Sequence, residues 1–408
     1  MLKLSRLFLL KEGAIMFKKF SVKSISVILV LSILLSISGC SSNKEEDEDK
    51  PTLSSSISSS ITFESTSEVS KDPKFDSVVL SLTADDFASE GIEFGDSCDV
   101  VFSNGLTYTD VPYYNGYYVK TGDLVIVAYP KSQYVLIARN NRDFWSSEGL
   151  SNDMSVEITL NTKGAYLATY EALGQDYSVD RTDYDSDEQF ANFRAMTGGN
   201  LKENFLYRGA SPVDNSRKRA RYADSLLEKY QIVTVIDLAD SEDDLESYQQ
   251  SNDFLSYYTM SLYENGKVVL LDMGANYDSD DYKESVAKGM RHLLANGGPA
   301  YIHCMEGKDR TGFICLLLEA LAGSSYEEMC SDYMTTYANY YKITKDGTPE
   351  KYDAVVALYF DAFMEYLYGS TDLEVLKSAD YTESAKGYLT GCGLTSEEIE
   401  QLVTLICK

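Results

Sequence analysis

The chain has 408 residues, of which 64 are Asp or Glu and 36 are Lys or Arg, so its formal net charge is -28 at pH 7. Such a negative surface repels phosphate backbones, which excludes nucleic acid as an expected partner, and it disfavours flat binding to anionic lipid. A hydrophobic content of 44% is enough for packed cores, and the length corresponds to about two or three domains.

Residues 1–39 have the pattern of a bacterial lipoprotein signal peptide. Lys18, Lys19 and Lys23 precede the apolar run Ile25–Ser38. This run is shorter than the ~20 residues that a bilayer-spanning helix needs, and it ends in Ser-Gly before Cys40, which resembles a lipobox. We therefore expect lipidation of Cys40 and a protein held on the outer face of the bacterial cell membrane, through its N-terminal lipid only. An uncleaved short anchor is the alternative.

Two segments with different compositions follow the signal peptide. Residues 40–73 are acidic and then serine-rich, which predicts a disordered tether. Residues 74–178 alternate short β-type runs with Gly- and Asn-containing turns, which predicts a small β-rich domain, a barrel or a sandwich. The expected strands are Ser77–Leu82, Cys98–Phe102, Leu124–Ala128, Tyr134–Ala138 and Val156–Leu160. A tyrosine-rich stretch at 112–118 either forms a binding surface or caps the sandwich or barrel.

Residues 179–408 alternate buried strands with amphipathic or apolar helices. This order predicts an α/β domain with a mainly parallel central sheet flanked by helices. The expected strands are Ile232–Leu238, Lys267–Leu271 and Ala300–His303. The expected helices are Arg217–Tyr230, Asp281–Asn296, Thr311–Ala322, Ser325–Ala338, Ala354–Tyr366 and Thr395–Cys407.

The segment that carries chemistry is His-Cys-Met-Glu-Gly-Lys-Asp-Arg-Thr-Gly at residues 303–312, between a strand and an apolar helix. Backbone N–H groups of such a loop converge on an anion, and the helix N-terminus adds partial positive charge. That field favours a thiolate, so Cys304 is expected to be a nucleophile. Arg310 can hold two phosphate oxygens in a bidentate fork. The alternative is a buried structural cysteine before an ordinary helix.

Cys304 and Arg310, with five residues between them, resemble the Cys-x5-Arg signature of the protein tyrosine phosphatase superfamily, and Gly-Lys-Asp-Arg-Thr-Gly is similar to the secreted bacterial members. The resemblance implies a phosphatase that forms a phosphocysteine intermediate and needs no cofactor or metal. It further implies that the remaining loop residues bind phosphate or support the loop: His303, Met305, Glu306, Gly307, Lys308, Thr311 and Gly312.

Three other segments resemble the same superfamily. Asn204–Pro212 is similar to an entry motif in which Tyr-Arg-Ser-Gly is common, with Gly209 in the place of Ser. Asp-Tyr-Met at 332–334 is similar to the Asp-Tyr-Leu that follows the loop helix. Val235–Leu238 resembles an Asp-Leu-Arg strand, but Ala239 replaces the Arg, which puts phosphate binding at this position in doubt.

The leaving oxygen needs a proton, and two carboxylates are candidates for the general acid. Asp309 lies in the loop, where the resemblance to the bacterial members places the acid, and it is the favoured candidate. Asp272 lies 32 residues before Cys304, where other tyrosine phosphatases carry a mobile acid loop, although Trp-Pro-Asp is absent.

The expected substrate is a phosphorylated protein or a small phosphomonoester, with phosphotyrosine favoured. A phosphoinositide or inositol polyphosphate is the alternative substrate, because Lys308 adds a cation beside the loop. A non-catalytic surface binding lipoprotein that uses the tyrosine-rich domain is the alternative that involves no enzyme.

Overall fold

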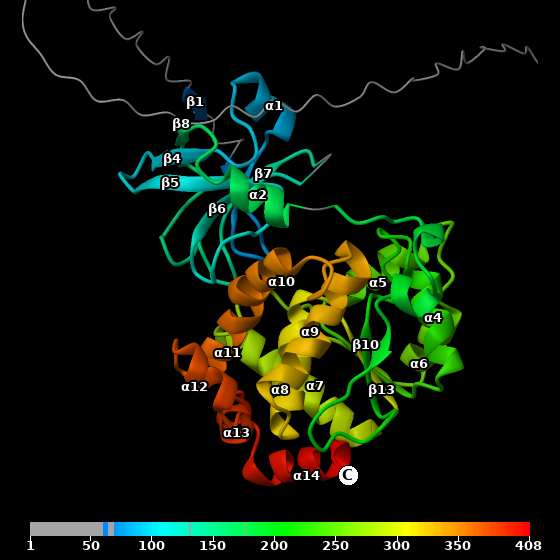
Figure 1. Cartoon of the computed structure of the whole chain (residues 1–408). Coiled ribbons are helices and arrows are strands. Elements are labelled where there is room, and N and C mark those ends of the chain that lie inside the picture. Colours follow the sequence, from blue (N-terminus) through cyan, green and yellow to red (C-terminus); the bar gives the residue numbers. More distant parts are fainter. Residues whose placement is uncertain (1–59, 64–68, 130–131, 175) are drawn as a thin grey trace, which may run out of the picture. The chain divides into compact units, whose positions relative to one another are not determined.

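The computed structural model describes residues 60–63, 69–129, 132–174 and 176–408 (Figure 1). The predicted signal peptide, the lipidation site Cys40 and most of the predicted tether lie outside these residues. The described residues all belong to one compact unit that starts after Ser56. None of their helices is long and apolar enough to cross a membrane.

A single eight-stranded sheet forms the β-rich part, in the order β1-β8-β4-β5-β6-β7-β3-β2. Neighbouring strands are antiparallel except β5 and β6. The strands are β1 (Ser60–Phe63), β2 (Val69–Lys71), β3 (Val78–Leu80), β4 (Ser97–Phe102), β5 (Thr107–Tyr114), β6 (Leu124–Val127), β7 (Val135–Arg139) and β8 (Val156–Thr162). The short helices α1 (Ala84–Ser89) and α2 (Leu167–Leu173) accompany them.

The sheet curls around one apolar core, because strands from both halves contribute to the same cluster. Leu80 of β3, Val100 of β4, Tyr113 of β5 and Ile137 of β7 all lie in it. The suggestion that the tyrosine-rich stretch forms a binding surface is therefore wrong for Tyr113 and Tyr114, each only 1% exposed. Their place on alternate faces of a strand buried on both sides explains why both rings are inside.

The tether expected over 40–73 is corrected at its end. Strand β1 pairs with β8, and β2 pairs with β3, so both edges of the sheet are formed by residues expected to be disordered. The sequence Ser-Ile-Thr-Phe of β1 alternates polar and apolar residues as an edge strand does. It lacks a hydrophobic run of its own, and only the partner strand reveals it.

The second part of the unit is built on a five-stranded sheet in the order β12-β11-β13-β10-β9. Its first four strands are parallel, and β9 is antiparallel at the edge. The strands are β9 (Arg194–Ala195), β10 (Leu206–Gly209), β11 (Thr234–Asp237), β12 (Val268–Leu270) and β13 (Ala300–His303). This confirms the predicted α/β fold with a mainly parallel sheet.

Helices cover this sheet, and further helices form the C-terminal part of the chain (Figure 1). They are α3 (Asp187–Phe190), α4 (Ala220–Lys229), α5 (Glu242–Gln249), α6 (Tyr257–Glu264), α7 (Asp280–Asn296), α8 (Asp309–Leu321), α9 (Tyr326–Tyr341), α10 (Pro349–Val355), α11 (Asp361–Tyr368), α12 (Leu373–Ser378), α13 (Thr382–Gly391) and α14 (Ser396–Ile406). One five-residue π-helical turn, Val356–Phe360, links α10 to α11 and interrupts the single helix that we expected there.

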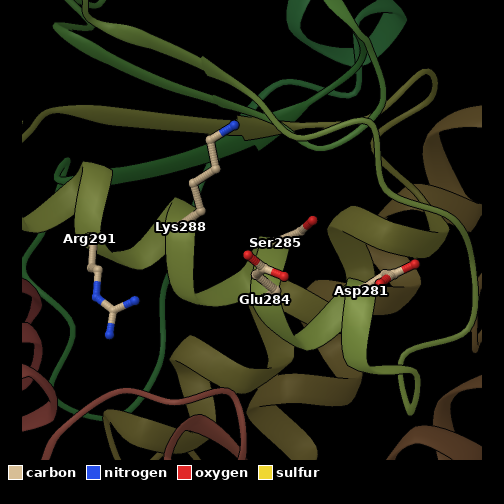
Figure 2. Close-up of a pocket in the computed structure, with 5 residues that line it drawn as sticks. All are labelled: Asp281, Glu284, Ser285, Lys288 and Arg291. Atoms are coloured by element: carbon tan, nitrogen blue, oxygen red, sulfur yellow. The ribbon is translucent and has the colours of Figure 1, made fainter.

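Helix α7 precedes the central strand β13. Its N-cap Ser279 accepts a hydrogen bond from the N–H of Tyr282, and Asp280 and Asp281 favour the positive end of the helix dipole. On its outer side α7 lines an open hollow with Asp281, Glu284, Ser285, Lys288 and Arg291 (Figure 2). Side chains of both charges line this hollow, so it does not select one sign of ligand charge.

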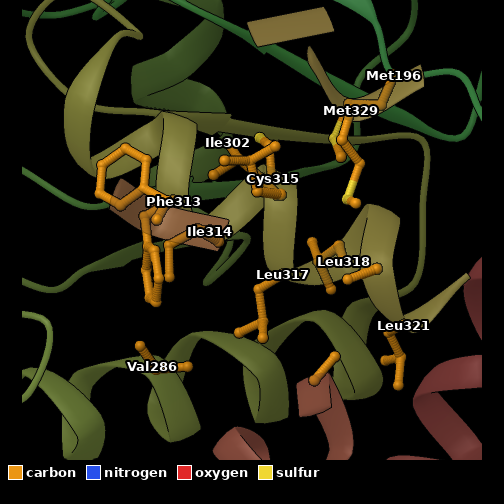
Figure 3. Packing of buried hydrophobic residues seen from close by; sticks show 14 of the residues in the cluster. Met196, Val286, Ile302, Phe313, Ile314, Cys315, Leu317, Leu318, Leu321 and Met329 are labelled. Carbon is orange, nitrogen blue, oxygen red and sulfur yellow. The ribbon is translucent and has the colours of Figure 1, made fainter. Parts of the chain in front are cut away.

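Helix α8 is mostly apolar, and all residues from Thr311 to Leu321 are buried, Glu319 included. A helix of this kind must be surrounded by protein. Figure 3 shows its side chains packed between Val286 of α7, Ile302 of β13 and Met329 of α9. The loop that joins β13 to α8 is therefore held at both ends by the core.

Candidate active site

Residues 304–310 form the cradle loop, which joins β13 to α8. Three of its carbonyl groups accept hydrogen bonds from neighbouring segments of the protein. The Met305 carbonyl accepts from the N–H of Ser211 at 3.1 Å, and the Glu306 carbonyl from the Tyr340 hydroxyl at 2.8 Å. The Gly307 carbonyl accepts from Arg208 at 3.1 Å. Because these carbonyl groups point to neighbouring segments, the N–H groups of the loop point in the opposite direction.

The amide groups of the loop are free for an anion. Among the described residues, no hydrogen bond is found for any backbone N–H from Met305 to Arg310. The last of these residues also form the first turn of α8, whose N–H groups have no partner within the helix. Unpaired N–H groups next to a helix N-terminus form an anion-binding site.

Gly307 allows the tight turn. Its φ is +69°, and a Cβ atom at this position would lie 2.2 Å from the carbonyl oxygen of Gly209 in β10. The two residues therefore approach backbone to backbone. At Gly209, where the resemblance leads us to expect Ser, a Cβ atom would lie 2.5 Å from the Tyr301 hydroxyl and 2.9 Å from the Ala191 carbonyl oxygen. Gly312 is also closely packed, since a Cβ there would lie 2.9 Å from the Tyr333 ring.

A buried ion network supports the loop from behind. Asp332 of α9 pairs with Arg208 of β10 at 2.5 Å and with Arg194 of β9 at 2.7 Å. Burial alone would raise the pKa of Asp332, but the two guanidinium groups outweigh it and lower the pKa. Arg208 in turn holds the Gly307 carbonyl. The segments at 206–209 and 332–334 are thus parts of one scaffold for the loop.

The predicted nucleophile and phosphate clamp lie at opposite ends of the loop. Cys304 is buried, 4% exposed and not in a disulfide. The Arg310 guanidinium donates to the carbonyl oxygen of Met273 at 2.9 Å, and it forms no ion pair with any described residue. Thr311 is fully buried, and its hydroxyl has no partner among the described residues. A hydroxyl donor is therefore available next to the loop.

His303 lies beneath the loop in a buried group of acids. Its Nδ1 is 3.4 Å from the Cys304 carbonyl, and its Nε2 is 3.8 Å from Asp237. Burial lowers the pKa of His303 to about 4, so the ring is neutral at pH 7. Burial also raises the pKa of Asp237 to about 6, and burial with the Asp237 charge raises that of Asp240 to about 8. Burial thus shifts both carboxyl groups toward their neutral forms, which reduces the negative charge beneath the loop.

The two general-acid candidates both lie at the edge of the site. Asp309 is the first residue of α8, is exposed, and pairs with Lys308 at 3.0 Å. Asp272 follows β12 in a left-handed conformation with φ +43°, next to Met273, whose carbonyl binds Arg310. Asp272 pairs with Lys74 of the β-rich part. Each carboxylate is therefore paired with a cation, and the geometry alone does not identify either carboxylate as the general acid.

Two other loop side chains are also paired. Glu306 accepts from the Tyr177 hydroxyl and pairs with Arg217 at 3.3 Å. Burial by itself would lower the pKa of Lys308. Nearby negative charges, that of Asp309 first, outweigh burial, so the pKa of Lys308 lies well above its usual value. Met305 is exposed at the mouth of the loop. Apart from Arg310, the side chains of the loop thus add little unpaired charge.

Lys74 and Phe75, which the sequence did not single out, also reach the site. The Lys74 ammonium donates to the carbonyl oxygen of Ala239, so the β-rich part places a cation at the position where the resemblance leads us to expect Arg. The Phe75 ring centroid is 5.8 Å from the Arg310 guanidinium carbon. No local pattern predicts these contacts, because they join residues more than 160 positions apart. The hollow of Figure 2 contains none of these residues.

The chain is similar to the core catalytic domain of the PP-IP phosphatase SIW14 from S. cerevisiae in complex with citrate, with 21% identity, 36% of this chain and 75% of that chain covered, and a TM-score of 0.25. It is also similar to TpbA of P. aeruginosa in complex with pTyr, with 16% identity, coverage of 50% and 96%, and a TM-score of 0.26. No curated protein matches. Residues 188–408, more than half of the chain, match the model of the tyrosine phosphatase family. This chain therefore belongs to the tyrosine phosphatase family and is a cysteine-dependent phosphatase.

Proposed function

We propose that the protein hydrolyses phosphotyrosine in proteins. The observation that carries this proposal is the cradle loop, which offers a set of unpaired N–H groups and the unpaired cation of Arg310 to a single phosphate. The Cys304 sulfur attacks phosphorus, and the bond from phosphorus to the leaving oxygen breaks. Asp309 or Asp272 protonates that oxygen. Water then cleaves the phosphocysteine, which releases inorganic phosphate and restores Cys304.

The charges around the loop favour a substrate with one phosphate. The nearby cations Lys308, Lys74 and Arg217 are each paired with a carboxylate of the site. An inositol polyphosphate needs several unpaired cations to compensate its charges, and here each additional phosphate would approach a carboxylate. This arrangement supports phosphotyrosine over the inositol polyphosphates that Lys308 suggested.

A substrate panel tests the proposal. Purified wild type and Cys304→Ser are compared for phosphate release from a phosphotyrosine peptide, a phosphoserine peptide and inositol hexakisphosphate. We expect release from the phosphotyrosine peptide by the wild type alone. Preferential release from inositol hexakisphosphate would move the assignment to the alternative substrate. The absence of turnover on all three would refute the enzymatic reading and favour a binding lipoprotein.

We further propose that a lipid on Cys40 anchors the protein at the outer face of the bacterial cell membrane. The basic segment, the short apolar run and the residues before Cys40 support this. Metabolic labelling with a fatty acid should mark the wild type and not Cys40→Ala. Equal labelling of the two would contradict the proposal.

A further inference from the structure

The turn between β2 and β3, residues 72–77, contacts the candidate active site from the β-rich part. Lys74 holds the carbonyl of Ala239 and pairs with Asp272, so the turn is fixed to two segments next to the cradle loop. Phe75 lies beside Arg310, with 5.8 Å between its ring centroid and the guanidinium carbon. The β-rich part is thus in contact with the phosphate clamp itself.

This turn is rigidly built. The Asp72 carboxylate accepts hydrogen bonds from the N–H groups of Lys74 at 2.8 Å and Phe75 at 2.9 Å. The Asp76 carboxylate accepts from the N–H and the hydroxyl of Ser146 at 2.8 and 2.7 Å. Aspartate side chains that bond the backbone two or three residues on fix a turn. Phe75 is therefore carried by a backbone that holds one position.

Apolar surface remains open at this place. Phe75 is 38% exposed, so its ring keeps apolar surface open to a ligand beside Arg310.

We propose that Phe75 forms an aromatic wall that binds the ring of an aryl phosphate and so determines the specificity of the site. The proposal rests on the proposed function and deepens it, because it names the part of the substrate that the β-rich part recognises. When Arg310 holds the phosphate oxygens, the ring of a phenolic leaving group is only one bridging oxygen away from phosphorus. Aromatic rings attract each other at centroid distances of about 4.5–7 Å, which Phe75 can reach from its position beside Arg310.

Binding to catalytically inactive protein tests this wall. Cys304→Ser, alone and combined with Phe75→Ala or Phe75→Tyr, is titrated with a phosphotyrosine peptide and with inorganic phosphate by calorimetry. Phe75→Ala should weaken phosphotyrosine binding by about 3- to 10-fold and leave inorganic phosphate unchanged, and Phe75→Tyr should restore the affinity. Tyr257→Ala on α6 is the matched control, because Tyr257 is exposed and has no aromatic or cation–π partner among the described residues.

Each outcome bears on the proposal. Equal weakening of phosphotyrosine and phosphate would mean that Phe75 acts only by holding Arg310, and it would overturn the aromatic wall. Unchanged phosphotyrosine affinity in Phe75→Ala would overturn it as well. In the active protein, Phe75→Ala should lower kcat/KM for phosphotyrosine and not for phosphoserine. A wild type without turnover would refute the proposed hydrolysis, while the binding comparison would still decide the role of Phe75.

Discussion

The contact between Gly307 and Gly209 leads to a sharp prediction for Gly307→Ala. The new Cβ would lie 2.2 Å from the Gly209 carbonyl oxygen, so that atom or the loop must move by about 0.8 Å to reach even 3.0 Å. Both sides of the contact are backbone, and no side chain can rotate away. Overpacking of this kind costs about 1–3 kcal/mol, and an L-residue in the left-handed conformation costs about 1–2 kcal/mol more.

A matched variant separates these two costs. Gly266→Ala places the same methyl group at φ +70°, against +69° for Gly307, with no other atom within 4 Å. It therefore carries the conformational cost alone. We expect both variants to unfold at lower urea concentration than the wild type. The free energy of unfolding of Gly307→Ala should be lower than that of Gly266→Ala by the cost of the contact with Gly209.

Activity gives the second readout for Gly307→Ala. If the loop yields, the Gly307 carbonyl moves from Arg208 and the N–H groups lose their common focus. A misplacement of about 1 Å can cost roughly 10²-fold in rate, so we expect a loss of this order in kcat/KM, measured on p-nitrophenyl phosphate. Gly266→Ala should keep the wild-type value. If Gly307→Ala matched Gly266→Ala in both unfolding and activity, the reasoning from backbone contact would be refuted.

Two further predictions concern carboxylates. Asp309→Asn should slow hydrolysis of a phosphotyrosine peptide by about 10²–10⁴-fold and that of p-nitrophenyl phosphate much less, because only the poorer leaving group needs a proton; if Asp272→Asn gives this pattern instead, Asp272 is the acid. Asp332→Asn should cost about 3–5 kcal/mol in urea unfolding, because it leaves the charges of Arg194 and Arg208 buried without a carboxylate. The folded pKa of Asp332 lies below its reference value of 3.8, so its contribution is present above pH 3.8 and is lost as the pH falls through the folded pKa. Acid unfolding below about pH 4 should therefore be steeper in the wild type than in Asp332→Asn, and equal slopes would contradict this assignment.

The cradle loop could be predicted from sequence because its parts are contiguous. Strand β13, the loop and α8 follow one another, so strand pattern, Cys, Arg and apolar helix all fall within about 20 residues. The helix starts at Asp309, two residues before the predicted Thr311, since the loop passes directly into the first turn. Local order was enough to identify the nucleophile and the clamp as candidates.

Elements that depend on partners were missed. Strand β5 contains Pro112 and Asp110, which argue against a strand, yet it pairs with β4 and β6 and buries Tyr113. Strand β10 has only four residues and includes Arg208, whose burial is possible only because Asp332 pairs with it. Local propensity carries no information on such pairing, and tertiary contact overrides it.

The net charge of -28 and the binding of a phosphate dianion are compatible because the charges at the site are arranged in pairs. Lys308, Lys74 and Arg217 each compensate a carboxylate, and burial shifts Asp240 toward its neutral form. Among the cations at the site, Arg310 has no carboxylate partner in the described residues. The field at the cradle loop then comes from its N–H groups and one guanidinium, which suffices for a single phosphate. If the β-rich part supplies Phe75 to bind the leaving group, selectivity comes from an aromatic ring, and an acidic protein gains specificity without the cluster of cations that a polyphosphate site requires.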